Sequence, residues 1–168
     1  GFWQKTEIGD LQYTSLSSKI KEKLLEDEQF WNIESLDNWL LFQSLDRIYI
    51  YNISDETFNI IDSEESILKM FKVNNAIYFQ DKTKGLFAFE NSKPKLISND
   101  AAILNDIVVG FFPVKEHFLV ITQNSGVFQL KNNQLSKFSD ILDGFSVYSS
   151  LKLNDKTLAI GTISNGII

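Results

Sequence analysis

Few side chains in this sequence could act as nucleophiles, general bases or soft metal ligands. The 168 residues include one histidine, His117, and no cysteine. A histidine-based catalytic triad or a cysteine-ligated metal site cannot be built from such a chain alone. His117 follows Lys115 and Glu116 in a polar segment, which indicates a solvated turn residue. We therefore expect no catalytic residue, no metal site and no cofactor.

Two acidic clusters have side chains that could bind Ca²⁺ or act as an acid and base pair. Asp62, Glu64 and Glu65 form one cluster, and Asp140 and Asp143 form the other. Neither has the alternating oxygen ligands and the fixed glycine of a calcium-binding loop. Solvated loops are therefore the simpler interpretation of both clusters.

A polar pair recurs wherever the second strand of a predicted repeat ends: Gln43-Ser44, Gln80-Asp81, Thr122-Gln123 and Gly161-Thr162. If the repeats surround one axis, these pairs could line a channel mouth and bind a polar ligand. The amides of Gln43, Gln80 and Gln123 could hydrogen-bond sugar hydroxyls, and Trp39 could add a stacking face. Alternatively, the polar groups close their own turns and Trp39 packs within a sheet. We take these four residues as the candidate ligand-binding set.

The elements that position these residues are short strands in a repeating unit. The segment 118–138 reads as three short strands separated by polar turns, and it resembles 77–97 and 158–168. Gly85, Gly126 and Gly166 mark the register, with spacings of 41 and 40 residues. A period of this size, built from strands, is typical of a β-propeller, whose blades are four-stranded antiparallel sheets. We predict an all-β fold in which the three glycines occupy equivalent places before third strands.

The pattern divides the chain into full and partial blades. We expect one propeller segment, 1–168, with these parts: a partial blade 1–14, full blades 29–61, 67–98 and 107–138, and a partial blade 146–168. The incomplete blades suggest a piece of a longer protein. An arc of a larger propeller and a closed small propeller both fit the count. We also expect at most one short helix, near 17–27, where Ser17 or Ser18 could cap it.

Within the first full blade the expected strands are Phe30–Glu34, Asn38–Gln43, Arg47–Tyr51 and Thr57–Ile61.

Composition excludes several classes of protein. Hydrophobic residues make up 43% of the chain and aromatic residues 13%, which is enough for a packed core and argues against intrinsic disorder. The net charge is −6 with no dense basic run, so we expect no direct contact with nucleic acid. No apolar run approaches the roughly 18 residues of a transmembrane helix, so we expect no membrane span in this segment.

Several segments resemble the propeller repeats of two-component regulators of the Bacteroidetes type: FWNIESLDNWLLFQSLDRIYIYN (30–52), YFQDKTKGLFAF (78–89), ITQNSGVFQL (121–130) and GFWQKTEIGDLQYTSL (1–16). In that family, multi-blade propellers precede a β-sandwich with a triple-tyrosine motif, a membrane segment, and a histidine kinase or helix-turn-helix module. The resemblance implies a periplasmic part of a membrane-anchored sensor or transcription regulator, often concerned with glycans. It assigns no ligand residue.

These observations favour a non-enzymatic sensor segment that binds a ligand or relays a signal. A protein–protein interaction scaffold without a small ligand is the alternative, and a propeller hydrolase or lyase is a further one. The expected partners are a glycan or another polar ligand, other propeller blades, or a dimer partner.

Overall fold

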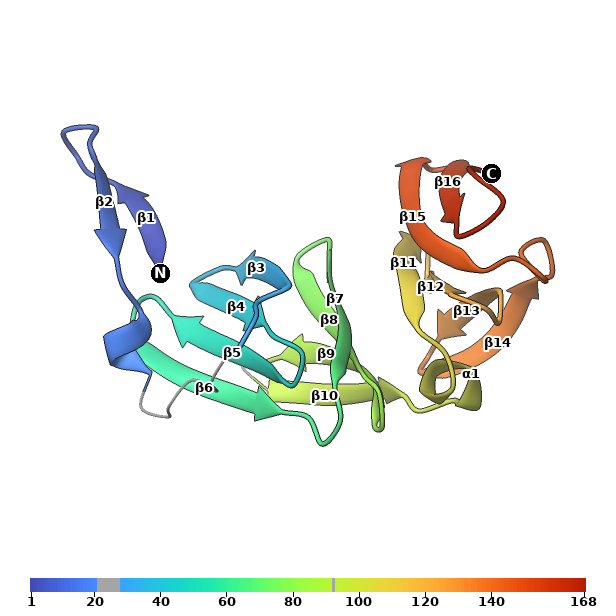
Figure 1. Cartoon of the computed structure of the whole chain (residues 1–168), viewed down its shortest axis with the longest axis horizontal. Coiled ribbons are helices and arrows are strands. Elements are labelled where there is room, and N and C mark those ends of the chain that lie inside the picture. The colour runs from blue at the N-terminus through green and yellow to red at the C-terminus, as the bar shows by residue number, and fades with distance from the viewer. Residues whose placement is uncertain (21–27, 92) are drawn as a thin grey trace. The chain divides into compact units, whose positions relative to one another are not determined.

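The computed structural model describes residues 1–20, 28–91 and 93–168. Within these residues the chain is built of antiparallel strands and two very short helices (Figure 1). It divides into two compact units, Gly1–Asp62 and Ser63–Ile168. The prediction of an all-β fold made of four-stranded antiparallel blades is confirmed.

The first unit holds a two-stranded hairpin and one complete blade. The hairpin strands are β1 (Phe2–Lys5) and β2 (Leu11–Thr14), followed by a 3₁₀ turn η1 (Ser17–Lys19). The blade runs in order β3 (Asn32–Leu36), β4 (Trp39–Gln43), β5 (Arg47–Asn52) and β6 (Thr57–Asp62). Its central strand β5 is buried from Ile48 onward, because alternate side chains face apolar neighbours on both sides of the sheet.

The second unit holds two complete blades and a further strand pair. The first blade is β7 (Ile67–Val73), β8 (Ala76–Asp81), β9 (Gly85–Glu90) and β10 (Lys93–Ser98), followed by the helix α1 (Ala101–Leu104). The second is β11 (Val108–Val114), β12 (His117–Thr122), β13 (Val127–Lys131) and β14 (Gln134–Ser139). The pair is β15 (Val147–Asn154) and β16 (Thr157–Thr162). Strand β11 contacts both β7 and β15, so first strands of successive blades lie side by side, as in a propeller.

The three glycines that mark the repeat occupy equivalent positions, as predicted. Gly85, Gly126 and Gly166 have φ values of 110°, 94° and 77°, which side chains rarely tolerate. Gly85 pairs with Asp81, and the backbone N–H groups of Thr122 and Thr162 donate to the carbonyls of Gly126 and Gly166. Each glycine therefore closes the turn between the second and third strand of its repeat.

Packing between the blades of the second unit is aromatic and aliphatic. Phe111 lies 4.6 Å from Phe118 and 4.7 Å from Tyr78, measured between ring centroids. Phe111 is buried, and these rings join a core cluster that includes Val120 and Leu130. Burying a side chain such as Phe111 contributes roughly 1.5–3 kcal/mol, so these contacts are a main source of cohesion between the blades.

Two details of the sequence prediction need correction. The strand expected at Phe30–Glu34 is β3, Asn32–Leu36, because the pairing with β4 runs from Asn32 opposite Gln43. The limit of one helix is also wrong. Besides η1 there is α1, whose N-cap Asp100 accepts a hydrogen bond from the backbone N–H of Ala102 at 2.9 Å. Most of the expected helix near 17–27 lies outside the described residues.

Candidate functional site

One residue of each recurring polar pair closes its own turn. The side-chain oxygen at this position accepts a hydrogen bond from the backbone N–H three residues later. The donor–acceptor pairs are Arg47 to Ser44 (3.1 Å), Lys84 to Asp81 (2.9 Å), Ser125 to Thr122 (3.1 Å) and Asn165 to Thr162 (2.9 Å). The structural alternative for these positions is therefore confirmed, and their polarity needs no ligand to explain it.

Gln123 does not occupy the same position in its repeat as the other two candidate glutamines. Gln43 and Gln80 come directly before the turn-closing residue, whereas Gln123 comes directly after it. In the blade of Gln123, the position equivalent to Gln80 is Ile121, which pairs with Val127 and is fully buried. The three glutamines thus do not form one ring of equivalent side chains.

Gln80 holds the segment that links two blades. Its side chain is fully buried, and Nε2 donates to the carbonyls of Ile103 and Asp106, both at 2.7 Å. Its Oε1 accepts a hydrogen bond from the backbone N–H of Val108 at 2.8 Å. A ligand that bound this amide would have to replace hydrogen bonds that the buried backbone needs.

Gln123 makes its contacts to the same segment through its main chain. Its N–H donates to the carbonyl of Ile107 at 2.8 Å, and its carbonyl accepts from Val147 at 2.7 Å. In the first unit, Gln43 is buried and its carbonyl accepts from Trp31, while Trp39 is half-buried at the other end of β4. Of the four candidate residues, Gln80 and Gln123 contact the same segment, which leads into β11. A ligand-binding role for the four residues stays a prediction.

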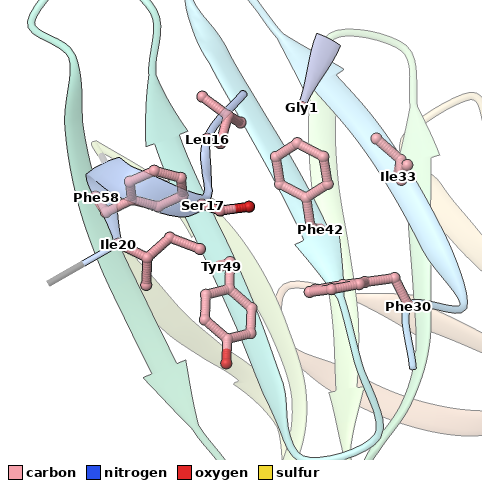
Figure 2. Close-up of a pocket in the computed structure, with 9 residues that line it drawn as sticks. All are labelled: Gly1, Leu16, Ser17, Ile20, Phe30, Ile33, Phe42, Tyr49 and Phe58. Atoms are coloured by element: carbon pink, nitrogen blue, oxygen red, sulfur yellow. The ribbon is translucent and has the colours of Figure 1, made fainter. Parts of the chain in front are cut away.

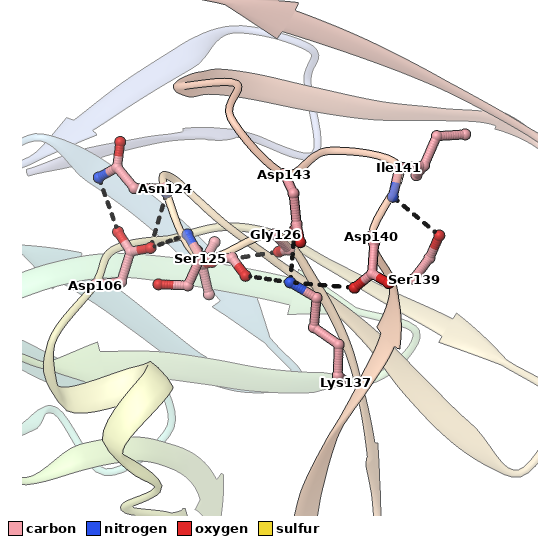
Figure 3. Close-up of polar contacts among 10 residues, drawn as sticks. Asp106, Asn124, Ser125, Gly126, Lys137, Ser139, Asp140, Ile141 and Asp143 are labelled. Atoms are coloured by element: carbon pink, nitrogen blue, oxygen red, sulfur yellow. Dashed lines mark hydrogen bonds and ion pairs between the residues drawn. The ribbon is translucent and has the colours of Figure 1, made fainter.

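A polar junction that the sequence did not reveal surrounds the turn at 123–126 (Figure 3). Asp106 Oδ2 accepts hydrogen bonds from the backbone N–H groups of Asn124 (2.8 Å) and Ser125 (2.6 Å). Burial would raise the pKa of Asp106, but the hydrogen bonds from Asn124, Ser125 and Ile107 outweigh it and lower the pKa below its ordinary value. The hydrogen bonds of Asp106 therefore favour its charged form and tie the carboxylate to the backbone of the 123–126 turn.

Lys137 completes this junction (Figure 3). Its Nζ lies 2.6 Å from Asp143 Oδ1 and 3.9 Å from Asp140 Oδ1, and it donates to the carbonyl of Ser125 at 2.8 Å. It also lies 5.3 Å from the ring centroid of Phe128. The lysine ammonium takes the place near Asp140 and Asp143 that a bound cation would need.

The other acidic cluster is also ion-paired. Glu64 lies 3.0 Å from Lys84 and Glu65 lies 2.6 Å from Lys82, while Asp62 lies 2.7 Å from Arg47 Nε. In the described ranges, no group of three or more His, Asp or Glu side chains could hold a metal ion.

The sequence context of His117 predicted a solvated turn residue, and this prediction is wrong. His117 begins β12 and is only partly exposed, and its ring centroid lies 6.2 Å from that of Phe138. Its Nε2 is buried and has no hydrogen-bond partner within the described part of the chain.

An apolar pocket of about 210 Å³ lies in the first unit (Figure 2). The rings of Phe30, Phe42, Tyr49 and Phe58 surround it, and Phe30 meets Tyr49 edge-on at 5.6 Å. The Tyr49 hydroxyl donates to Glu28 Oε2 at 2.5 Å. Burial and this hydrogen bond raise the pKa of Tyr49. The pocket is suited to an apolar group. In the sequence, it was indicated only by the aromatic residues among the strands of this blade.

The fold defines the class of protein: a segment built of β-propeller blades. The sequence matches no protein-family model and has no significant match among curated proteins. None of the helices among the described residues has the length and apolar character needed to cross a bilayer.

Solved structures similar to this chain include extracellular domains of two-component systems. The extracellular domain of the hybrid two-component system BT3049 from B. thetaiotaomicron has a TM-score of 0.63, 16% identity, and covers 95% of this chain and 22% of its own. That of BT4673 from the same organism has a TM-score of 0.62, 18% identity, and covers 87% of this chain and 21% of its own. BamB from Moraxella catarrhalis has a TM-score of 0.59, 11% identity, and covers 81% of this chain and 42% of its own.

The chain thus spans less than half the length of each of these proteins. At the level of fold, the resemblance to two-component regulator propellers is confirmed, since extracellular domains of such systems share this fold.

Proposed function

We propose that this chain is part of a periplasmic sensor propeller that binds a ligand or relays a signal without catalysing a reaction. The observation that carries this proposal is the structural similarity to extracellular domains of two-component systems over most of the chain. The candidate reactive groups fit the same view, because Asp106, Lys137 and Asp143 are engaged with one another or with backbone groups. The proposed output is signal transduction and transcription regulation through further modules.

The proposed ligand is a glycan or another polar molecule, contacted by loops at one end of the blades. Loops on a rigid scaffold are where binding residues usually lie. Gln43, Gln123 and Trp39 are the proposed contacts, each considered within its own unit. Trp39 lies at the opposite end of β4 from Gln43, so it is proposed as a separate stacking position. Gln80 belongs to this set only if ligand binding rearranges its hydrogen bonds.

A glycan array followed by calorimetry tests this proposal. We expect binding of at least one glycan and no release of a cleaved product. Replacing Gln43, Gln123 or Trp39 by Ala should weaken binding about tenfold, the loss expected from one good contact. A product formed with the kinetics of turnover would contradict the non-catalytic role. Unchanged affinity in all three variants would remove these residues from the site.

A protein-interaction scaffold is the second candidate, and exposed apolar sheet faces favour it. Trp3 and Tyr13 pair across the β1–β2 hairpin with ring centroids 5.1 Å apart, and they are 65% and 52% exposed. Leu151 and Leu153 of β15 are similarly exposed. Apolar surface of this kind is typical of contacts with another blade or a partner. Sedimentation analysis of the chain and of a Trp3→Ser, Tyr13→Ser variant tests this. If these side chains form an interface between copies of the chain, the variant should lose the self-association that the wild type shows.

A further inference from the structure

A polar groove of about 570 Å³ lies in the second unit, between the end of one blade's last strand and the outer hairpin of the next blade. Ser98, the last residue of β10, forms one wall together with Asn99 and Asp100, and the β13–β14 hairpin forms the other. The volume is within the range of sites for small ligands. None of the four residues selected from the sequence lines this groove.

Carboxamides dominate its lining. The residues that carry them are Asn99, Gln129, Asn132, Asn133 and Gln134, and two serines add hydroxyls. A carboxamide both donates and accepts hydrogen bonds, as does each hydroxyl of a sugar. The two charged lining residues are already engaged. Lys131 pairs with Glu116 at 3.4 Å, and Asp100 caps α1. The groove is therefore suited to a neutral ligand rich in hydroxyls.

The turn itself explains two of these amides but not the rest. Asn132 and Asn133 have φ values of 51° and 62°, and Lys131 pairs with Gln134 across them. Such a two-residue turn needs positive φ at both positions, which Asn tolerates. Gln129 and Gln134 lie on the strands, where the backbone makes no such demand. Their amides need another explanation.

The preceding blade shows that the fold does not require them. The residues of its hairpin that correspond to Gln129, Gln134 and Ser136 are Ala88, Lys93 and Lys95, since both hairpins have the same pairing register. There, Lys95 forms an ion pair with Glu90 at 3.0 Å. The same register thus forms with Ala88, Lys93 and Lys95 at these places, so the repeat itself does not require the polar side chains of Gln129, Gln134 and Ser136.

One of the groove amides, that of Gln129, is also held in place. Gln129 Nε2 donates to Ser136 Oγ across the strand pair at 3.1 Å, which orients the amide. Leu135, between Gln134 and Ser136, packs against the core cluster between the blades and anchors β14. Preorganised donors and acceptors lose less entropy when a ligand binds.

We propose that this groove binds a neutral ligand of one or two sugar rings, through Gln129, Gln134 and Asn99. The inference rests on the proposed ligand-binding function and adds to it a second contact region, away from the ends of the second strands.

The test is a titration of the ¹⁵N-labelled chain, followed by NMR, with cellobiose, maltose and lactose at up to about 50 mM, a range that detects millimolar affinity. Acyclic sorbitol serves as a hydroxyl-rich control without a ring. The side-chain amide signals of Gln129, Gln134 and Asn99 should shift saturably with at least one disaccharide and not with sorbitol. The exposed amide of Gln12 on β2, in the other unit, should not shift.

Replacing Gln129 and Gln134 by Ala should weaken binding about tenfold, whereas Gln12→Ala should leave it unchanged. The single change Gln134→Ala, at an exposed position, serves if the double variant does not fold. Saturable shifts elsewhere in the chain, without shifts in the groove, would overturn the groove and leave the proposed function standing. No shift with any disaccharide would overturn the groove as a sugar site, while the glycan array tests the function separately.

Discussion

The role of Gln80 can be tested by a change that keeps its size and removes its donors. In Gln80→Glu, the carboxylate would face the carbonyls of Ile103 and Asp106, to which Nε2 now donates. In Gln80→Ala, those carbonyls and the N–H of Val108 would lose their partner. Gln80→Ala loses three buried hydrogen bonds at about 1 kcal/mol each and leaves their partners unsatisfied. Gln80→Glu loses the two donated by Nε2 and places a buried charge against two carbonyls. We expect a loss of roughly 3–5 kcal/mol for either variant.

The positions of the tryptophans allow the unfolding of the first unit to be followed separately. All three tryptophans, Trp3, Trp31 and Trp39, belong to the first unit, so their fluorescence reports on that unit. Urea unfolding followed by circular dichroism should show the loss for Gln80 variants. Hydrogen exchange should show reduced protection of Val108 in particular. Gln123→Ala is the matched control and should change stability by less than about 0.5 kcal/mol, because its contacts to Ile107 and Val147 use the main chain.

A loss below about 1 kcal/mol in both Gln80 variants, with Val108 still protected, would refute the structural role of this amide. Gln80 would then return to the set of side chains available for a ligand.

Three further results are expected. Phe111→Ala should lower the stability of the second unit by about 3–5 kcal/mol in urea unfolding, because the ring is buried between blades. Gly126→Ala should cost more than Gly144→Ala in calorimetry, because both have positive φ but only the first Cβ would meet other atoms, 2.7 Å from Asp143 Oδ1. The pKa of Asp106 is lowered in the folded chain, so its contribution is full above its ordinary pKa of 3.8 and is lost as the pH falls through the folded value. An acid titration should therefore destabilise the wild type below about pH 4 more steeply than Asp106→Asn.

The blade register could be predicted because few residues satisfy the geometry that it needs. A turn that enters the third strand with a strongly positive φ selects glycine, so Gly85, Gly126 and Gly166 reveal the repeat directly. Strands are equally visible, because alternation of apolar residues follows from the pleat. The helix α1 was missed although Asp100 is a favourable N-cap, since four residues give too short a pattern to stand out.

The roles of the glutamines could not be predicted, because residue type does not show which atoms a residue uses. Val108 and Val147 occupy equivalent places, opposite Thr122 and Thr162. The N–H of Val108 is bound by the side chain of Gln80, and that of Val147 by the main-chain carbonyl of Gln123. A recurring backbone donor is thus satisfied in two ways, and both happen to use glutamine.

Residues that differ between blades are better indicators of a ligand site than residues that recur in every blade. Polar residues that recur in register, such as Asp81 and Thr122, answer a need that every blade shares, so their recurrence indicates structure. A residue that departs from its counterpart in the next blade, where the fold accepts either, has no such explanation. Gln134 in place of Lys93 is such a departure, and it lines a groove. In a propeller, the differences between blades therefore carry more information about binding than the similarities do.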